Sequence, residues 1–542
     1  MSFAPNAKMK FLRPSLQYPN RSLHGLLSAA VERCPDRAAV IDGDRKLTFR
    51  ELDALSNAGA RALAELGVGY GDRLALYLGN SAEFEVAFFS GSKVGAILTP
   101  LNTSFKAQEA RYQLEDSGAK VCIVEQDLLR HITGLTRYVQ TLEEFVVVGK
   151  GPIGGGTPLF HEWIAGKSTE PFDGPPIDPA EDLITISYSS GTTGPPKGVM
   201  LTHRNLVSNH IQFITNHRVT SRDRALLFLP LYGAGGTMIM GGMVAAAGTQ
   251  ILMKRFEAKK AFSLIERHRV SLFYGAPPDL LAIADYPDLS PFDFSSLRYI
   301  MSGAAPLCPE LRERVQERTG VLTFMAYGLT EASPLTHMNP PIAELVKAES
   351  VGPPVSDEQQ RVVDLETGEL EVPPGEAGEL VLRGPHIMKG YWNAPEETAR
   401  TLRDGWLYTG DLVRADEEGY IYFQDRLEEM IRYKGFEIAP TELEAVLRRH
   451  SGVVDCAVVG KPDSEAGEIP KAFIVLQNKN KNEVNAEDIV DFVRAQVDEY
   501  RQVREVEFTR AIPRSASGKI LRRILREEEE GQPEDLAGEP LS

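Results

Sequence analysis

Cysteine is scarce in this sequence of 542 residues. The four cysteines, Cys34, Cys122, Cys308 and Cys456, lie far apart and form no closely spaced pair. Structural zinc sites and secreted disulfide frameworks both require cysteines in regular, short spacings. The pattern therefore favours a protein of a reducing compartment, and we expect a cytoplasmic location.

Positive charge is also in short supply. The chain has 59 Lys and Arg residues against 76 Asp and Glu residues, so its formal net charge is −17. Nucleic-acid-binding proteins need a broad positive surface to meet the phosphate backbone, and this balance disfavours such a partner. Any anionic ligand must instead meet lysine and arginine gathered locally within a site.

An uninterrupted membrane-spanning run is missing as well. The longest uncharged stretch extends from Ala225 to Met253, which is long enough to cross a bilayer. It is interrupted by Pro230 and by six glycines: Gly233, Gly235, Gly236, Gly241, Gly242 and Gly248. The interruptions predict a buried strand, a loop, a short helix and a second strand rather than a transmembrane segment. No apolar run follows the basic residues near the start, so we expect no signal peptide.

The length and the local patterns predict an α/β protein of at least two domains. Helix-length segments separate short apolar runs, which favours parallel strands. One helix is predicted over Leu23–Val31, and another begins at Thr48, which forms a capping pattern with Glu51, and stops near Gly67. The strand-like runs are Leu74–Leu78, Val121–Val124, Leu183–Ser187, Ala225–Leu229, Ser271–Tyr274 and Tyr299–Ser302.

The pattern changes after about residue 427, where a smaller α+β unit is expected. Thr441 and Glu444 suggest a second capping pattern, and Asn485 starts a further amphipathic helix. Val453–Val459 and Ala472–Leu476 are strand-like. We therefore expect a large domain over 1–427, a small domain over 428–526 and an acidic, disordered tail over 527–542.

The sharpest local motif runs from Tyr188 to Gly198, directly after a predicted strand, and reads YSSGTTGPPKG. Its glycines allow the backbone to turn closely around a ligand, its hydroxyls offer donors, and its lysine adds positive charge, a combination that suits a polyphosphate. The residues expected to bind are Ser189, Ser190, Gly191, Thr192, Thr193, Gly194 and Lys197. Pro196 excludes the Walker pattern, and a surface Gly/Ser/Thr hairpin is the alternative interpretation of the segment alone.

This segment resembles the phosphate-binding loop of the adenylate-forming superfamily, which includes acyl-CoA synthetases, luciferases and peptide-synthetase adenylation domains. Further blocks that resemble the superfamily follow in order between about residues 20 and 525. They are SGAAP at 302–306, YGLTE at 327–331, GEL at 378–380, GYW at 390–392, YTGD at 408–411, DR at 425–426, YKGF at 433–436 and SGK at 517–519.

The resemblance implies a large N-terminal domain of parallel sheets and helices with a β-barrel-like part, and a small mobile α+β C-terminal domain. It also implies an acid:CoA ligase that uses ATP and Mg²⁺. The acid attacks the α-phosphate to form acyl-AMP, pyrophosphate leaves, and the thiol of CoA then accepts the acyl group. Negative charge must be neutralised throughout the first step.

The resemblance assigns the nucleotide site. Thr330 contacts the α-phosphate, and Glu331 holds Mg²⁺, a hard ion that prefers carboxylate and phosphate oxygen. Asp411 accepts both ribose hydroxyls and Arg426 supports it. Tyr327 and Gly328 lie on one side of the adenine, with Gly303, Ala304 and Ala305 on the other.

The resemblance also divides the two half-reactions between two faces of the small domain. Lys519 is expected to serve adenylation, although Arg514, Arg522 and Arg523 around it are equally typical of a solvated basic helix. The domain then rotates about a hinge at Glu428. The segment of Lys434, Gly435 and Phe436 replaces the loop that carries Lys519, called the lysine loop below, while CoA enters. No nucleophilic side chain is required.

Three positions differ from what the resemblance leads us to expect: Gly233 where many relatives carry histidine, Met325 where glutamine is usual, and Glu428 where lysine or aspartate is common. Neutral drift is one explanation. The other is an apolar, roomy acyl pocket for a fatty, alicyclic or aromatic acid. The pocket residues are expected to be Tyr232, Gly233, Gly235, Met325 and Ala326.

Several alternatives stay open at this point. The acceptor thiol could belong to a carrier protein, the acceptor could be oxygen, or the chain could perform mainly the thioesterification step. A non-catalytic protein that senses an acyl-nucleotide is a different class. The expected partners are the acid, ATP and CoA, with no nucleic acid and no transmembrane segment, and the oligomeric state, homodimer included, is open.

Overall fold

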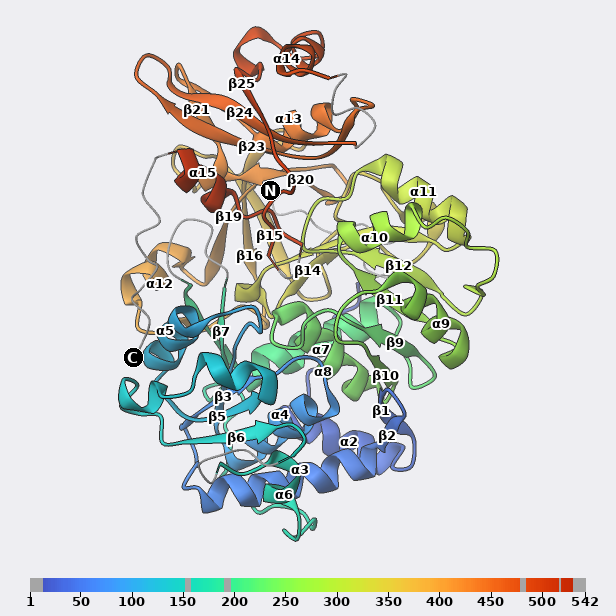
Figure 1. Cartoon of the computed structure of the whole chain (residues 1–542), viewed down its shortest axis with the longest axis vertical. Helices are drawn as coiled ribbons and strands as arrows, with labels where there is room; N and C mark the ends of the chain where they lie inside the picture. The colour runs from blue at the N-terminus through green and yellow to red at the C-terminus, as the bar shows by residue number, and fades with distance from the viewer. Residues whose placement is uncertain (1–12, 152–156, 190–195, 478–483, 516–517, 530–542) are drawn as a thin grey trace.

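The computed structural model of the chain describes residues 13–151, 157–189, 196–477, 484–515 and 518–529. A large domain carries three sheets, and a smaller domain with its own sheet packs against one end of it (Figure 1). The predicted class, α/β with a large N-terminal domain and a small α+β C-terminal domain, is confirmed.

The first sheet is mostly parallel. Its eight strands run in the order β14-β13-β12-β11-β9-β10-β1-β2, and only the edge strands β14 and β2 pair antiparallel. The strands are β14 (Leu335–Met338), β13 (Thr323–Gly328), β12 (Tyr299–Ser302), β11 (Leu272–Gly275), β9 (Arg224–Leu227), β10 (Thr249–Leu252), β1 (Ala38–Asp42) and β2 (Arg45–Thr48).

The second sheet repeats this plan with seven strands in the order β17-β8-β7-β4-β3-β5-β6. Its five strands from β7 to β6 are parallel, and β8 turns back against β7 as a hairpin. The strands are β17 (Gly390–Tyr391), β8 (Gly198–Thr202), β7 (Leu183–Tyr188), β4 (Ile97–Pro100), β3 (Arg73–Tyr77), β5 (Ala119–Glu125) and β6 (Glu144–Val148).

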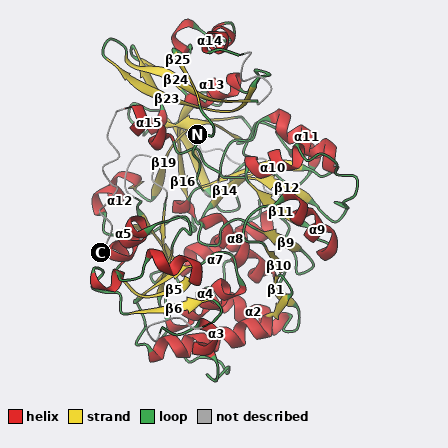
Figure 2. Cartoon of the chain, viewed as in Figure 1, coloured by secondary structure: helices red, strands yellow, loops and turns green. Residues whose placement is uncertain are grey.

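Three buried helices join the two sheets. The helix α4 (Ala82–Val94) contacts β3 and β4 of one sheet and β1 of the other, while α8 (Ala234–Ala246) contacts β9, β10 and α7 (His203–Asn216). Figures 1 and 2 show α7 and α8 between β5 and β6 on one side and β9 and β10 on the other. A helix that is apolar all round, as α8 is, belongs in such a position.

The remaining helices of the large domain are α2 (His24–Arg33), α3 (Phe49–Glu65), α5 (Ala107–Ser117), α6 (Phe160–Ile164), α9 (Ala258–His268), α10 (Pro277–Ala284), α11 (Pro309–Thr319) and α12 (Pro395–Thr401). The predicted capping box at Thr48 is present, because the Thr48 side chain accepts from the Glu51 N–H and Glu51 accepts from the Thr48 N–H. The uncharged stretch forms β9, a loop, α8 and β10, as predicted. Among the described helices none is long and apolar enough to cross a membrane.

The third sheet is antiparallel and supplies the part predicted to be barrel-like. Its order is β15-β16-β19-β18, with β20 paired to β19. The strands are β15 (Gln359–Val363), β16 (Ala377–Arg383), β18 (Leu402–Arg403), β19 (Trp406–Ala415) and β20 (Ile421–Arg426). The strand β20 ends where the short 3₁₀ helix η6 (Leu427–Glu429) leads into the small domain.

The small domain packs helices on a fourth sheet of order β22-β21-β24-β23, with β25 parallel to β24. Its strands are β21 (Ile431–Tyr433), β22 (Phe436–Ile438), β23 (Val453–Asp463), β24 (Gly467–Leu476) and β25 (Glu505–Phe508). Its helices are α13 (Pro440–Leu447), α14 (Ala486–Arg494) and α15 (Arg522–Glu529). Asn485 caps α14 through a capping box with Asp488, as the sequence indicates.

Two predictions for this domain are wrong. Thr441 does not cap a helix, because α13 begins at Pro440 with Ala439 at the cap position and without a side-chain cap. Its N–H and hydroxyl instead donate to Asp425 Oδ2 over 2.9 and 3.0 Å. The expected tail also starts too early, since α15 continues through residues 527–529. Residues 530–542 lie outside the described part of the chain.

Candidate active site

The described residues of the predicted nucleotide site converge where parallel strands end. Ligands of α/β proteins bind at the carboxyl ends of the strands. Here β7 leads into the phosphate-type loop, β12 into the SGAAP segment and β13 into the YGLTE segment. The third sheet adds Asp411, in the middle of β19, and its strand partner Arg426, at the end of β20. Segments more than 200 residues apart in sequence therefore border one site.

The phosphate-type loop is described only at its two ends. The N–H of Ser189 donates to the carbonyl of Lys197 over 3.0 Å, which closes the base of the loop. Ser190, Gly191, Thr192, Thr193 and Gly194 lie outside the described residues. The base itself is packed tightly, since a Cβ added at Gly198 would come within 2.7 Å of Ile186 Cγ2.

A chain of polar contacts runs from this loop toward Glu331. The Lys197 ammonium lies 2.7 Å from Glu397 Oε2 on α12 and 5.4 Å from the centre of the Tyr391 ring. The Tyr391 hydroxyl donates to Glu331 Oε1 over 2.9 Å. Glu331 and Thr330 belong to the short 3₁₀ helix η4 (Thr330–Ala332) directly after β13. The structure thus brings Lys197, Thr330 and Glu331 to one edge of the site.

Glu331 can hold Mg²⁺ only together with other ligands. Within the described part of the chain no three His, Cys, Asp or Glu side chains gather to form a metal site. One Glu331 oxygen already accepts from Tyr391, and the second is available to a cation. Mg²⁺ commonly binds through one or two carboxylates and completes its shell with phosphate oxygen and water. The residues present fit that mode.

Asp411 lies at the centre of a polar triad with Tyr327 and Arg426, both of which are partly exposed. Its side chain is fully buried, the Tyr327 hydroxyl donates to its Oδ2, and Arg426 Nε lies 3.2 Å from its Oδ1. Asp411 raises the pKa of Arg426 above its ordinary value, and burial followed by Asp411 raises that of Tyr327. No described group donates a well-formed hydrogen bond to Oδ1 of Asp411. That oxygen is an acceptor that a ligand hydroxyl can satisfy.

The ring of Tyr327 is set by neighbouring aromatic side chains. Its centre lies 5.8 Å from that of His337 and 6.2 Å from that of Phe423. Gly328 follows it at the end of β13 and is exposed. On the neighbouring strand, the Gly303 N–H donates to the Gly275 carbonyl over 3.0 Å, and Ala304 has a φ of +70°. The Gly303–Ala305 segment is therefore a bent loop with accessible backbone beside the aromatic ring.

Lys519 reaches this group from the small domain. Its pKa is lowered to about 8, mainly by burial and next by Arg426, while Glu429, Asp411 and Glu428 act in the opposite direction. Its loop also packs against the large domain, since a Cβ added at Gly518 would lie 3.3 Å from Ala276 Cβ and 3.4 Å from Pro278 Cδ. The arrangement places the lysine beside the Asp411 triad.

The segment expected to serve the thiol lies elsewhere in the same arrangement. Lys434 and Gly435 form the turn of the β21–β22 hairpin, with φ values of +48° and +85°. The ring of Phe436 is half exposed and stacks on Tyr500 at a centre distance of 4.6 Å. In Figure 1, β21 lies on the far side of β23 from the large domain. Lys519, and not this turn, therefore faces the large domain.

The expected acyl-pocket residues surround the start of α8. Tyr232, Gly233 and Gly235 are half-buried there, and a small cavity borders Ala234, Thr237 and Ser333. A Cβ added at Gly233 would approach only the Pro230 carbonyl oxygen, at 3.4 Å, so this position has free space.

Met325 and Ala326 lie deeper, on β13. The Met325 side chain is 5% exposed and belongs to the core beneath the loop, where the Leu307 N–H donates to its sulfur over 3.3 Å. Ala326 is 8% exposed. Both residues belong to the buried strand that carries the site.

The family model for AMP-binding enzymes matches residues 27–392, and the model for the AMP-binding enzyme C-terminal domain matches residues 442–519. The chain belongs to the AMP-binding enzyme family. Its relatives include 4-coumarate–CoA ligase 5 of Oryza sativa subsp. japonica, which is 37% identical over 529 residues that cover 95% of this chain and 96% of the relative. A long-chain-fatty-acid–CoA ligase of Bacillus subtilis (strain 168) is 34% identical, with 95% and 96% covered.

The fold agrees with a solved member of the family. The anthranilate CoA ligase AuaEII, in complex with anthranoyl-AMP, superposes with a TM-score of 0.85 at 30% identity over 94% of this chain and 98% of that one. This AMP-binding enzyme is an ATP-dependent, AMP-forming acid:CoA ligase, an acyl-CoA synthetase of the adenylate-forming superfamily. ATP and CoA are the substrates of this family.

Sequence reasoning missed two residues of this AMP-binding enzyme's site. Tyr391 was available in the GYW block, and its hydroxyl contact with Glu331 required the fold to be seen. Glu397 carries no motif at all, because it is one of two adjacent glutamates at the start of α12. Its ion pair with Lys197 spans 200 residues of sequence.

We expect Asp411→Asn to raise the KM for ATP by about 100-fold or more, because two ribose hydrogen bonds to a carboxylate contribute about 1.5–3 kcal/mol each. Asparagine keeps the shape but removes the charge that pairs with Arg426 and that the resemblance assigns to the ribose hydroxyls. The measurement is steady-state adenylation as a function of ATP concentration. The control is Asp416→Asn, at a turn just after β19 where Asp416 binds Lys347. Equal KM values in the two variants would refute the ribose assignment.

Proposed function

We propose that the enzyme activates a fatty, alicyclic or aromatic acid as acyl-AMP and then transfers the acyl group to CoA, with release of AMP and pyrophosphate. The observation that carries this proposal is the position of Lys519 beside the Asp411–Arg426–Tyr327 triad at the carboxyl ends of β12 and β13. An ammonium group in that place can neutralise charge at the α-phosphate.

The nucleotide half of the proposal assigns each contact to a residue. Asp411 accepts from the ribose hydroxyls, Tyr327 lies against the adenine, and the Gly303–Ala305 backbone borders the other side. The loop that begins at Ser189 and ends at Lys197 holds the β- and γ-phosphates, and Thr330 binds the α-phosphate. Glu331 holds Mg²⁺, which when bound supplies positive charge to the leaving pyrophosphate.

In the first step the substrate carboxylate attacks the α-phosphorus and the bond to pyrophosphate breaks. Lys519 donates to the charge that builds on the α-phosphate oxygens. In the second step the CoA thiol loses its proton to water, its sulfur attacks the acyl carbonyl carbon, and the bond from that carbon to the phosphate oxygen breaks as AMP leaves with the electron pair. The small domain turns about Glu428 between the steps and replaces Lys519 by the Lys434–Phe436 segment.

Two features of the pocket support an apolar acid of some size. The space at Gly233 would be filled by a larger side chain, and the helix α8 behind it is uncharged along its whole length. The relatives named above are ligases of 4-coumarate, of long-chain fatty acids and of anthranilate. Pockets for such ligands are predominantly apolar with a few placed polar groups.

The test is a panel of acids assayed for pyrophosphate release with and without CoA. We expect cinnamate-type, benzoate-type and medium-chain acids to release pyrophosphate, and acyl-CoA to form only when CoA is present. A clear preference for acetate or for an amino acid would overturn the acid class. Transfer to a phosphopantetheine carrier protein but not to CoA would overturn the acceptor.

A further inference from the structure

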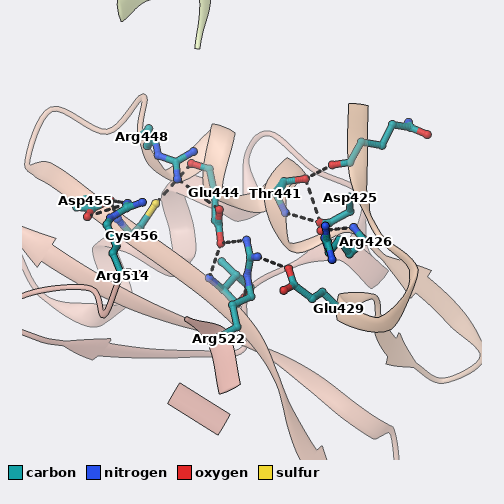
Figure 3. A network of polar contacts seen from close by, with 12 residues as sticks. Asp425, Arg426, Glu429, Thr441, Glu444, Arg448, Asp455, Cys456, Arg514 and Arg522 are labelled. Atoms are coloured by element: carbon teal, nitrogen blue, oxygen red, sulfur yellow. Dashed lines mark hydrogen bonds and ion pairs between the residues drawn. The ribbon is translucent and has the colours of Figure 1, made fainter. Parts of the chain in front are cut away.

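Arg522, three residues after Lys519, is a buried cation with three separate attachments. Its side chain is 7% exposed and lies at the first position of α15. Nη2 donates to Glu444 Oε1 over 2.7 Å, Nη1 donates to Glu429 Oε2, and Nε donates to the Val458 carbonyl over 3.2 Å. Figure 3 shows the guanidinium between the two carboxylates. The alternative of a solvated basic helix is wrong for Arg522, which is buried.

The partners of Arg522 lie on three different elements. Glu429 ends η6 and directly follows the proposed hinge residue, Glu428. Glu444 belongs to α13 and also accepts from the Val458 N–H over 3.0 Å. Glu429 and Glu444 are only 3% and 2% exposed. The helix α15 holds Glu429 a second time, because Arg526 donates to its backbone carbonyl over 3.3 Å.

The other end of the lysine loop is fixed too. Arg514 Nη2 contacts both Asp455 oxygens, over 2.8 and 3.0 Å, and Arg514 Nη1 donates to the Gly518 carbonyl over 2.8 Å. The Lys519 N–H donates to Ser515 Oγ over 3.1 Å. Arg514 thus connects the lysine loop to β23, whereas Arg522 connects it to Glu429 beside the hinge.

We propose that Arg522 is a positioning residue for Lys519, which joins the lysine loop to Glu429 at the hinge and to Glu444 of α13. The inference rests on the proposed role of Lys519 in adenylation. Rotation about Glu428 then moves Glu429, α13 and the lysine loop as one rigid unit. The ammonium arrives at the α-phosphate in a fixed position because its loop cannot shift relative to the hinge.

The geometry explains why arginine stands at this position. Its planar group donates in three directions from one rigid plane, whereas a lysine ammonium is a compact point charge on a flexible stem. Two buried carboxylates also require a buried cation as a partner. Arg523, the next residue, is 51% exposed and pairs with Glu527 of its own helix. The neighbouring arginine therefore provides a matched control.

The test compares Arg522→Gln with Arg523→Gln in the full chain. We expect Arg522→Gln to lower acyl-AMP formation by about 100-fold, the scale expected when a reacting group is misplaced by about 1 Å. Thioester formation from synthetic acyl-AMP and CoA should stay close to that of the parent enzyme, and Arg523→Gln should match the parent in both assays. Equal losses in both half-reactions of Arg522→Gln would show a merely structural role, and normal adenylation would refute the proposal.

Glu429→Gln provides a second, milder variant that keeps a hydrogen-bond acceptor for Arg522. The groups that act on Lys519 are Arg426, Glu429, Asp411 and Glu428, and Glu429 raises its pKa. Removal of the Glu429 charge should lower the pKa of Lys519, so the kcat/KM of adenylation should fall off at a lower pH than in the parent enzyme. The rate of adenylation should also be lower. An unchanged pH profile and rate would contradict the coupling. Lys519→Ala distinguishes the two claims. If Lys519→Ala adenylates normally, the proposed function fails. If Lys519→Ala loses adenylation but Arg522→Gln adenylates normally, only the inference about Arg522 fails.

Discussion

Lys519→Ala is expected to lose acyl-AMP formation while it still makes thioester from synthetic acyl-AMP and CoA. The loss should reach about 100- to 1,000-fold, the range found when one donor to a developing oxyanion is removed. Lys519 is half-buried, its loop packs against Ala276 and Pro278 of the large domain, and Arg426 and Asp411 act in opposite directions on its pKa. Among the described residues, the hydrogen bond and the ion pair of the Asp411 side chain are with Tyr327 and Arg426 and include no other lysine.

The measurement is pyrophosphate exchange for the first step and acyl-CoA formation from synthetic acyl-AMP for the second. The control is Lys461→Ala, which changes a lysine of the same domain that pairs with Glu505 at its surface over 2.7 Å. Adenylation by Lys519→Ala at the rate of this control would overturn the assignment. A loss of both half-reactions would instead indicate damage to the small domain.

The large domain could be predicted from sequence because its signals are local. Buried strands of β3, β5, β7 and β12 appear as apolar runs, and the capping box at Thr48 lies within four residues. The uncharged stretch from Ala225 to Met253 could be divided correctly into strand, loop, helix and strand. Its proline and glycines indicate where the loop lies and where the backbone packs closely. A Cβ added at Gly236 would lie 2.1 Å from the Pro230 carbonyl oxygen, so the glycine is required there.

The small domain was harder because its decisive contacts are distant in sequence. Thr441 and Glu444 have the spacing of a capping box, but Thr441 bonds to Asp425 at the end of β20, and Glu444 bonds to Arg522, 78 residues further along (Figure 3). A local pattern cannot compete with a buried cation that needs a carboxylate. The composition around Lys519 likewise indicated solvated arginines and could not show that one of them is buried.

The site likewise contains residues that the motifs predict and residues that only the fold reveals. The motif residues Tyr327, Asp411 and Arg426 come together because the sheets determine their positions. Asp411 and Arg426 are partners across β19 and β20, and Tyr327 lies near the end of β13. Glu397 and Glu429 carry no motif, and their ion pairs with Lys197 and Arg522 follow only from the fold. The sequence motifs indicate which chemistry each residue is expected to contribute to a nucleotide site. The fold adds the supports that hold the lysines in place.

The opposite defect is expected from Gly435→Leu, which should adenylate at close to the parent rate but form acyl-CoA about 100-fold more slowly, as misplacement of reacting groups by about 1 Å can cause. In the present arrangement a Cβ added at Gly435 would meet nothing within 4 Å, so the position has room for a side chain. If the domain rotates as proposed, the same side chain would occupy the space assigned to the pantetheine arm.

Backbone strain must be separated from this steric effect. Gly435 has a φ of +85°, and a left-handed conformation costs an L-residue about 1–2 kcal/mol. Gly375 is a matched control, since its φ is +90° and an added Cβ there also meets nothing within 4 Å. Gly375→Leu should therefore show a similar loss of thermal stability with both half-reactions intact. If Gly435→Leu also forms acyl-CoA normally, the turn is not the path of the thiol, and the two faces of the small domain do not divide the reaction as proposed.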